Sequence, residues 1–260
     1  MLKIYVHLVI IVFLLFTGNL ILNAQIINIE DRRLQIEDET TQDSVKWLGR
    51  IGLAFSWTQN KSKIFRMDGN AQFERLVKKH LLLSITDYSF AKFDENRFIN
   101  QGFQHFRYNY RIRNRLTYEA LFQIQTNKLA NIDLRVLTGT GLRFRLYQKG
   151  KGNGFYGVTY LYEYEEESLE QLTHQNHRLS TYFSFEWLPV ENITISSTTY
   201  YQPLFTDFSD YRITTQSNVV LPISKQFNFT VAISYIYDSH PAKGAPDRLY
   251  NFVNGLRFNF

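Results

Sequence analysis

The sequence predicts an all-β protein: a closed antiparallel transmembrane β-barrel of about 12 strands, preceded by an N-terminal signal peptide. Apolar and polar residues alternate in short segments from residue 46 to residue 260, which is the signature of amphipathic strands. No segment in that range follows the 3.6-residue period of a helix. The 260 residues contain no cysteine, which excludes a disulfide framework, a cysteine-based zinc site and a cysteine nucleophile.

Residues 1–24 have the layout of a secretory signal peptide. Lys3 precedes an apolar run, and Ala24 is a small residue at a plausible cleavage position. The alternative is a membrane-anchoring helix, which the polar residues His7 and Asn19 inside the run disfavour. Cleavage would export the remainder of the chain, and the expected destination is the outer membrane of a Gram-negative cell envelope.

Residues 25–45 are predicted to form an acidic periplasmic arm. Six acidic residues and two arginines lie between residues 26 and 45, and neither strand nor helix period runs through them. The segment is either a solvated tail or a docking arm for an envelope protein.

The first amphipathic segment, 47–57, shows why a membrane is expected. Its odd-numbered residues are mostly apolar and begin and end with Trp47 and Trp57, while the residues between them are mostly small or polar. Ten residues at ~3.3 Å each, tilted by about 40°, span about 25 Å, the height of the lipid-facing band of a membrane barrel. The predicted aromatic girdle consists of Trp47, Trp57, Trp187, Tyr250 and Phe260.

The same alternation recurs along the chain in twelve segments. They are 47–57, 65–73, 81–90, 98–110, 116–124, 132–144, 156–164, 179–187, 193–201, 211–221, 227–237 and 250–260. The orientation of the two faces is ambiguous for 81–90 and 98–110. The even number of strands places both termini on the periplasmic side, with longer outer loops expected at 165–177, 203–210 and 238–248.

Charged residues fill one face of many of these segments. A soluble sandwich would place this face in water and bury the apolar face, but no helical segment is available to cover the latter. A barrel in lipid accommodates both faces, because the charged face lines the lumen. The predicted lumen-lining residues are Arg66, Glu119, Asp133, Arg135, Arg143, Arg145 and Glu163. Their near balance of charge favours cross-strand ion pairs, with Arg143 and Arg145 as a positive surplus near the periplasmic mouth.

Other candidate chemistry is weaker. His174 and His177 lie in the expected outer loop 165–177, where a three-residue spacing fixes no metal geometry. The glycine-rich run 148–154 enters a strand and is interpreted as a turn. Gly139 and Gly141 are expected to make room for a neighbouring aromatic ring, or else for a ligand. We expect no catalytic residue, no metal, no cofactor and no nucleic-acid partner.

Residues 80–166 resemble a known family. The carrying elements are His80-Leu81-Leu82-Leu83-Ser84, Glu95-Asn96-Arg97-Phe98, Tyr108-Asn109-Tyr110, Leu116-Thr117-Tyr118-Glu119, Ile132-Asp133-Leu134-Arg135 and Gly139-Thr140-Gly141-Leu142-Arg143. They are similar to the DUF481 family of salt-induced outer-membrane proteins, and the resemblance extends plausibly over residues 46–260. It implies an outer-membrane barrel and no particular reaction. The export signal and aromatic-rich strands also resemble those of Bacteroidota.

Three functions remain open at this point. The first is a narrow, porin-like pore for small solutes, and the second is a non-conducting structural or accessory barrel. The third, least favoured, is a lipid hydrolase at the rim. The expected partners are outer-membrane lipids, the outer-membrane insertion machinery acting on the C-terminal Phe260, and an envelope protein bound through residues 26–45.

Overall fold

A computed structural model describes residues 45–59, 63–93, 97–149, 151–190, 193–224 and 227–258. The predicted signal peptide, nearly all of the acidic arm and Phe260 lie outside the described residues. All twelve predicted segments are strands. Their bounds are β1 Val45–Gln59, β2 Lys63–Val77, β3 His80–Phe93, β4 Arg97–Arg113, β5 Leu116–Asn127, β6 Ile132–Lys149, β7 Gly152–Glu167, β8 Thr173–Trp187, β9 Thr194–Pro203, β10 Tyr211–Pro222, β11 Phe227–Asp238 and β12 Arg248–Phe258.

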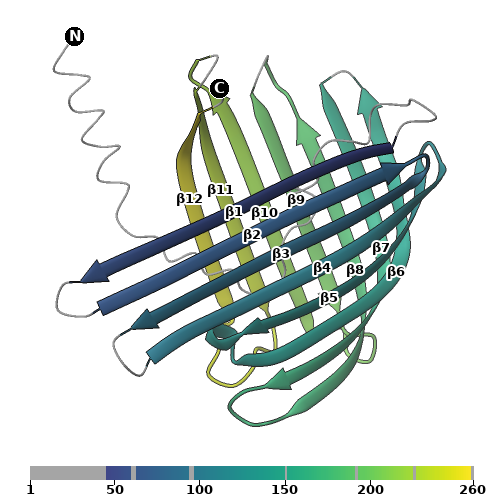
Figure 1. Cartoon of the computed structure of the whole chain (residues 1–260). Coiled ribbons are helices and arrows are strands. Elements are labelled where there is room, and N and C mark those ends of the chain that lie inside the picture. The colour runs from purple at the N-terminus through teal and green to yellow at the C-terminus, as the bar shows by residue number, and fades with distance from the viewer. Residues whose placement is uncertain are drawn as a thin grey trace, which may run out of the picture.

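The twelve strands form one antiparallel sheet in which each strand pairs with its neighbours in sequence. The sheet curls on itself, so that β1 to β4 pass in front of the steeper strands β9 to β12 (Figure 1). A short 3₁₀ helix, Lys128–Ala130, joins β5 to β6. No helix within the described ranges is long and apolar enough to cross a membrane.

The sheet differs from the expected closed barrel at one seam. Among the described residues β1 and β12 are the two edges of the sheet and do not pair with each other. An edge strand leaves its outer row of backbone N–H and C=O groups unpaired. Pairing between β1 and β12 would satisfy these groups, and in lipid it is the arrangement that leaves no edge.

The polarity of the sheet is inverted relative to a soluble protein. On β1, the apolar side chains of Ile51, Leu53 and Trp57 are exposed to 79%, 70% and 71%. On the opposite face of the curled sheet, charged and amide side chains such as Glu119, Gln123 and Arg135 are buried. The alternation in the sequence therefore separates an apolar outer face from a largely polar inner face.

The ambiguous segments β3 and β4 have a simple structural explanation. Leu83 and Ile85 of β3 point inward and pack with Phe103 of β4 in a small buried apolar cluster. Leu82 on the outward face of β3 is also apolar and is 47% exposed. Because both faces of this segment are apolar, alternation alone could not assign them.

One predicted outer loop is shorter than expected. β7 continues to Glu167 and β8 begins at Thr173, so the connection is 168–172 and not 165–177. His174 and His177 therefore lie on β8 and not in a loop. Residues three apart on a strand face opposite sides, and each histidine bonds a different partner: His174 bonds Glu167 at 2.8 Å, and His177 bonds Tyr160 at 2.5 Å. This pair cannot share a metal ion.

Inward-facing glycines allow close packing between β6, β7 and β8. A Cβ on Gly157 would lie 2.0 Å from the ring of Tyr182, so the missing side chain is the space that this ring occupies. A Cβ on Gly141 would lie 2.2 Å from the carbonyl oxygen of Val158. The expectation of an aromatic ring beside Gly139 and Gly141 is wrong, because their close neighbours are Leu161, Thr159 and the β7 backbone.

Candidate functional site: the interior of the curled sheet

A buried ion network lies inside the sheet, near the ends of the strands that lead to connections 168–172, 204–210 and 239–247. It is built from three arginines and four carboxylates, contributed by β6, β7, β8, β10, β11 and the residue before β10. The members of this buried ion network are Arg135, Glu163, Glu165, Arg178, Asp210, Arg212 and Asp238.

Glu163 is the centre of this network. Its side chain is 0% exposed and contacts three guanidinium groups. Arg178 Nε donates to Glu163 Oε2 at 2.6 Å, Arg135 Nε lies 3.0 Å from Oε1, and Arg212 Nη1 donates to the same Oε1. Arg135 and Arg178 come from the strands next to β7, whereas Arg212 reaches in from β10. The network thus ties together strands that do not pair.

The remaining carboxylates supply further acceptors for the arginines. Arg135 Nε donates to Glu165 Oε2 at 2.6 Å, and Arg212 Nε donates to Asp238 Oδ2 at 2.7 Å. Arg178 Nη1 donates to Asp210 Oδ1 at 2.8 Å. A buried charge without such partners would be strongly destabilising, so each arginine depends on at least two acceptors.

A second polar group lies nearer the opposite ends of the strands. Tyr182 of β8 donates its hydroxyl to Glu119 Oε2 of β5 at 2.7 Å, although these strands do not pair. Arg107 and Arg143 approach Glu119 Oε1 at 3.8 and 4.0 Å. The guanidinium of Arg143 also lies over the ring of Phe155, 3.8 Å from its centroid, in a cation–π contact.

Between these two groups the inner faces of β4 to β9 nearly meet. They enclose a cavity of about 30 Å³ beside His105, Leu161 and Tyr200. A volume of this size holds about one water molecule. We call the inward faces of β4 to β8 the packed side.

The inward faces of β1 and β12, which we call the open side, are different. The inward positions of β1 include Ala54, Ser56 and Thr58, which are exposed. On β12, Asn251 and Gly255 are only half-buried. A Cβ on Gly255 would have no neighbour closer than 3.8 Å, in contrast to Gly157 on the packed side. At these positions the open side is less crowded than the packed side.

Connections at the network end of the sheet contact one another. Asn131, after the 3₁₀ helix, donates its side-chain amide to the carbonyl of Lys243 in connection 239–247 at 2.9 Å. Lys243 Nζ in turn donates to Glu170 in connection 168–172 at 2.5 Å. The Glu170 carboxylate holds the pKa of Lys243 above its usual range, so this lysine stays charged. Connection 239–247 thus contacts both Asn131, between β5 and β6, and connection 168–172, between β7 and β8.

The structure separates the predicted lumen residues into different groups. Arg135 and Glu163 belong to the buried ion network, and Glu119 and Arg143 belong to the second group. Arg145 is half-buried and donates to Gln148 at 2.5 Å, while Arg66 pairs with Asp68 on its own strand at 2.6 Å.

Asp133 is placed at the rim and not in the interior. A bulge between Ile132 and Leu134 shifts the register, and Asp133 pairs with Lys128 and Ser168 outside. The lumen-lining residues predicted from the sequence do not include Arg107, His105 or Tyr182. The first two lie on β4, whose faces alternation could not assign, and a tyrosine in an aromatic-rich strand gives no signal that it turns inward.

The predicted girdle residues lie at strand ends on the outer face. Trp47 lies near the start of β1 and packs on Phe73, with ring centroids 5.0 Å apart, and Trp57 lies near the other end of β1. Trp187 ends β8, and Tyr250 of β12 packs on Tyr235 at 5.1 Å. Phe260 lies outside the described residues.

The fold and the interior place this protein in the class of antiparallel β-barrel proteins. Its twelve-stranded sheet is apolar outside and largely polar inside. The chain belongs to the DUF481 family, described as "Protein of unknown function, DUF481", whose model matches residues 49–253. The expected family membership is confirmed.

Solved structures similar to this chain include the following two. The structure titled "NanC porin structure in rhombohedral crystal form" is 9% identical, with a TM-score of 0.48, over 83% of this chain and 99% of that chain. OccK11 (OpdR) of Pseudomonas aeruginosa is 8% identical, with a TM-score of 0.37, over 82% of this chain and 84% of that chain. No curated protein matches the sequence.

Proposed function

We propose that this protein is an integral outer-membrane barrel with a narrow pore for small solutes. In this proposal β1 and β12 pair to close the barrel, and solutes pass along the open side, with the buried ion network as the opposite wall. The proposal is carried by the contrast between the small inward residues Ala54 and Ser56 of β1 and the buried charges of β6 to β8.

The outer face supports placement in lipid. Trp47 and Trp57 both point outward, ten residues apart, which matches the ~25 Å height of a lipid-facing band. The outward hydroxyls on β9 and β10 pair with each other: Ser197 with Ser217 at 2.9 Å, and Thr199 with Thr215 at 3.1 Å. Such pairing lowers the cost of placing hydroxyls in hydrocarbon.

The size of the interior supports a narrow pore. Barrels of eight strands are filled by side chains and those of sixteen or more are open channels, so twelve strands lie between these limits. Here the packed side fills part of the cross-section. The free path is expected where Ala54 and Ser56 of β1 face inward.

A non-conducting accessory barrel is the alternative, and burial of the network favours it. The side chains of Arg135 and Glu163 are 1% and 0% exposed, whereas the lining of a water-filled channel is hydrated. The acidic arm, 25–45, would then be the docking segment for an envelope partner. For both the pore and the accessory barrel, we expect from the sequence that the insertion machinery recognises Phe260. We also expect no catalytic role in either case.

Planar-bilayer recording of the refolded full chain tests the pore directly. The informative variant is Ala54→Trp, which places a large ring on the inward face of β1. Its matched control is Leu53→Trp, one residue away on the outward face, where the ring would face lipid.

The pore proposal predicts steady wild-type conductance, a reduction of at least about half in Ala54→Trp, and an unchanged conductance in Leu53→Trp. Reproducible silence from a correctly folded wild-type barrel would reject the pore and support the accessory barrel. Equal conductance in all three proteins would reject the path along β1.

A further inference from the structure

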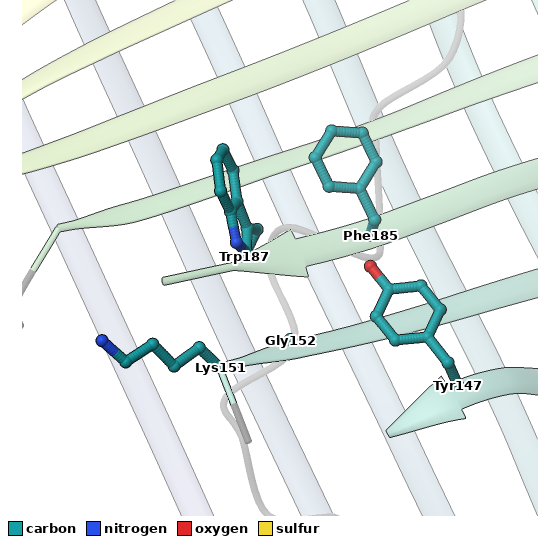
Figure 2. Close-up of a pocket in the computed structure, with 5 residues that line it drawn as sticks. All are labelled: Tyr147, Lys151, Gly152, Phe185 and Trp187. Atoms are coloured by element: carbon teal, nitrogen blue, oxygen red, sulfur yellow. The ribbon is translucent and has the colours of Figure 1, made fainter. Parts of the chain in front are cut away.

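A notch opens on the outer face of the sheet where β6 turns into β7 (Figure 2). Tyr147, Lys151, Gly152, Phe185 and Trp187 line this notch, and its volume is about 470 Å³. Register places Tyr147 and Phe185 opposite Gly154, and Trp187 opposite Gly152, so these rings share the outward face of three neighbouring strands. The glycines supply a floor without side chains, and the aromatic rings supply apolar walls.

The ring of Tyr147 fills part of the space that the glycines leave. A Cβ on Gly154 would lie 2.1 Å from this ring, and a Cβ on Gly152 would lie 3.3 Å from it. The ring is therefore held flat across β7 by the neighbouring backbone. In Figure 2 the Tyr147 hydroxyl and the Trp187 indole nitrogen lie above Gly152, whereas the Lys151 side chain extends away from both of them along the edge of the notch.

Three hydrogen-bond donors surround this notch, and among the described residues none has a protein acceptor: the Tyr147 hydroxyl, the Trp187 indole N–H and the Lys151 ammonium. Two other outward tyrosines have a protein partner, since Tyr108 bonds His80 at 2.7 Å and Tyr160 bonds His177 at 2.5 Å. Tyr147 and Trp187 are 44% and 49% exposed, so their polar atoms are accessible to a ligand from outside the sheet. Two neutral donors and one ammonium group next to apolar side chains are complementary to an anion that accepts hydrogen bonds and has a hydrocarbon chain.

We propose that this notch binds an anionic phospholipid, with the phosphate at Lys151, Trp187 and Tyr147 and an acyl chain along Gly152 and Phe185. The position fits a lipid of one leaflet, because Trp187 ends its strand at the level where aromatic belts meet headgroups. The inference goes beyond the pore and rests only on the membrane placement in the proposed function.

Native mass spectrometry of the refolded full chain tests this site. The probes are phosphatidylglycerol and phosphatidylcholine with the same acyl chains, added in equal amounts. We expect preferential retention of phosphatidylglycerol, and a loss of about fivefold of that preference in Lys151→Gln, the size expected for one lysine at a membrane surface. Tyr147→Phe, which removes only the hydroxyl, should weaken retention without affecting the fold.

The matched control is Lys79→Gln, which removes an exposed lysine in the 78–79 turn at the same end of the sheet. Equal losses in Lys79→Gln and Lys151→Gln would show that surface charge alone selects the lipid and would overturn the proposal. If the wild-type chain inserts into vesicles but retains both lipids equally, the lipid site at the notch is rejected and the membrane placement is not. Failure of the chain to insert at all would instead overturn the membrane placement.

Discussion

The packed side and the open side are built on the same meander of strands, yet they differ in almost every physical respect. On the packed side, Tyr182 crosses from β8 to Glu119 of β5, and Glu163 gathers arginines from three strands. On the open side, β1 presents Ala54 and Ser56 inward and leaves them exposed. The difference teaches that cross-barrel contacts, and not strand pairing alone, hold the shape of the interior.

Removing the central carboxylate charge should have the largest effect. Glu163→Gln keeps the shape of the side chain but leaves three buried arginines short of one counter-charge. We expect a loss of about 3–5 kcal/mol in the free energy of unfolding, measured by urea titration of the refolded barrel. Asp247→Asn is the control, because Asp247 forms an exposed ion pair with Arg248 at the longer distance of 3.6 Å. This substitution should change the free energy of unfolding by no more than about 0.5 kcal/mol. Equal effects would show that the network contributes no more than a surface pair.

Adding one methyl group on each side sharpens the comparison. In Gly157→Ala the new Cβ meets the ring of Tyr182, which Glu119 and Gly157 together hold in place. Overpacking of this kind should destabilise the barrel by about 1–3 kcal/mol. Gly255→Ala, also inward but on the open side, should change stability by less than about 0.5 kcal/mol, since no atom lies within 3.8 Å. A similar loss in both variants would mean that the open side is as crowded as the packed side.

Breaking the contact between connections 239–247 and 168–172 should produce the smallest effect on stability. Lys243→Glu places a carboxylate opposite Glu170 and breaks the tie between connections 239–247 and 168–172. Both groups are exposed, so stability should hardly change. If the tie narrows the mouth, single-channel conductance should rise modestly in Lys243→Glu, and restoring the pair in Lys243→Glu with Glu170→Lys should return it to the wild-type value. A fall in conductance in the single variant would contradict a closing role for this connection.

Alternation along the chain was sufficient to predict the twelve strands, because each face of most strands meets a different environment. It failed to orient β3 because Leu82 and Leu83 place apolar groups on both faces of the strand. The end of β7 was also misjudged: the acidic run Glu165, Glu166 and Glu167 has the composition of a loop, but Glu165 pairs with Arg135 inside the sheet.

The interior was predictable only in part. Near balance of inward charge correctly predicted ion pairs, and Arg135 and Glu163 were among the residues expected to line the lumen. Contacts between strands that do not pair, such as Arg212 with Glu163, depend on how strongly the sheet curls. A local pattern contains no information about that curvature. The bulge that moves Asp133 to the rim is hidden from a two-residue period for the same reason.

Labelling of single cysteines tests the central contrast most directly, because the wild-type chain contains no cysteine. Ser56→Cys probes the open side, Ser180→Cys the packed side, where Ser180 is 4% exposed, and Leu53→Cys the outer face. In lipid vesicles, a water-soluble maleimide should modify Ser56→Cys at least about tenfold faster than the other two, because only a hydrated thiol ionises readily. Equal rates at positions 56 and 180 would contradict the two-sided interior, and fastest labelling at position 53 would contradict the placement of the outer face in lipid.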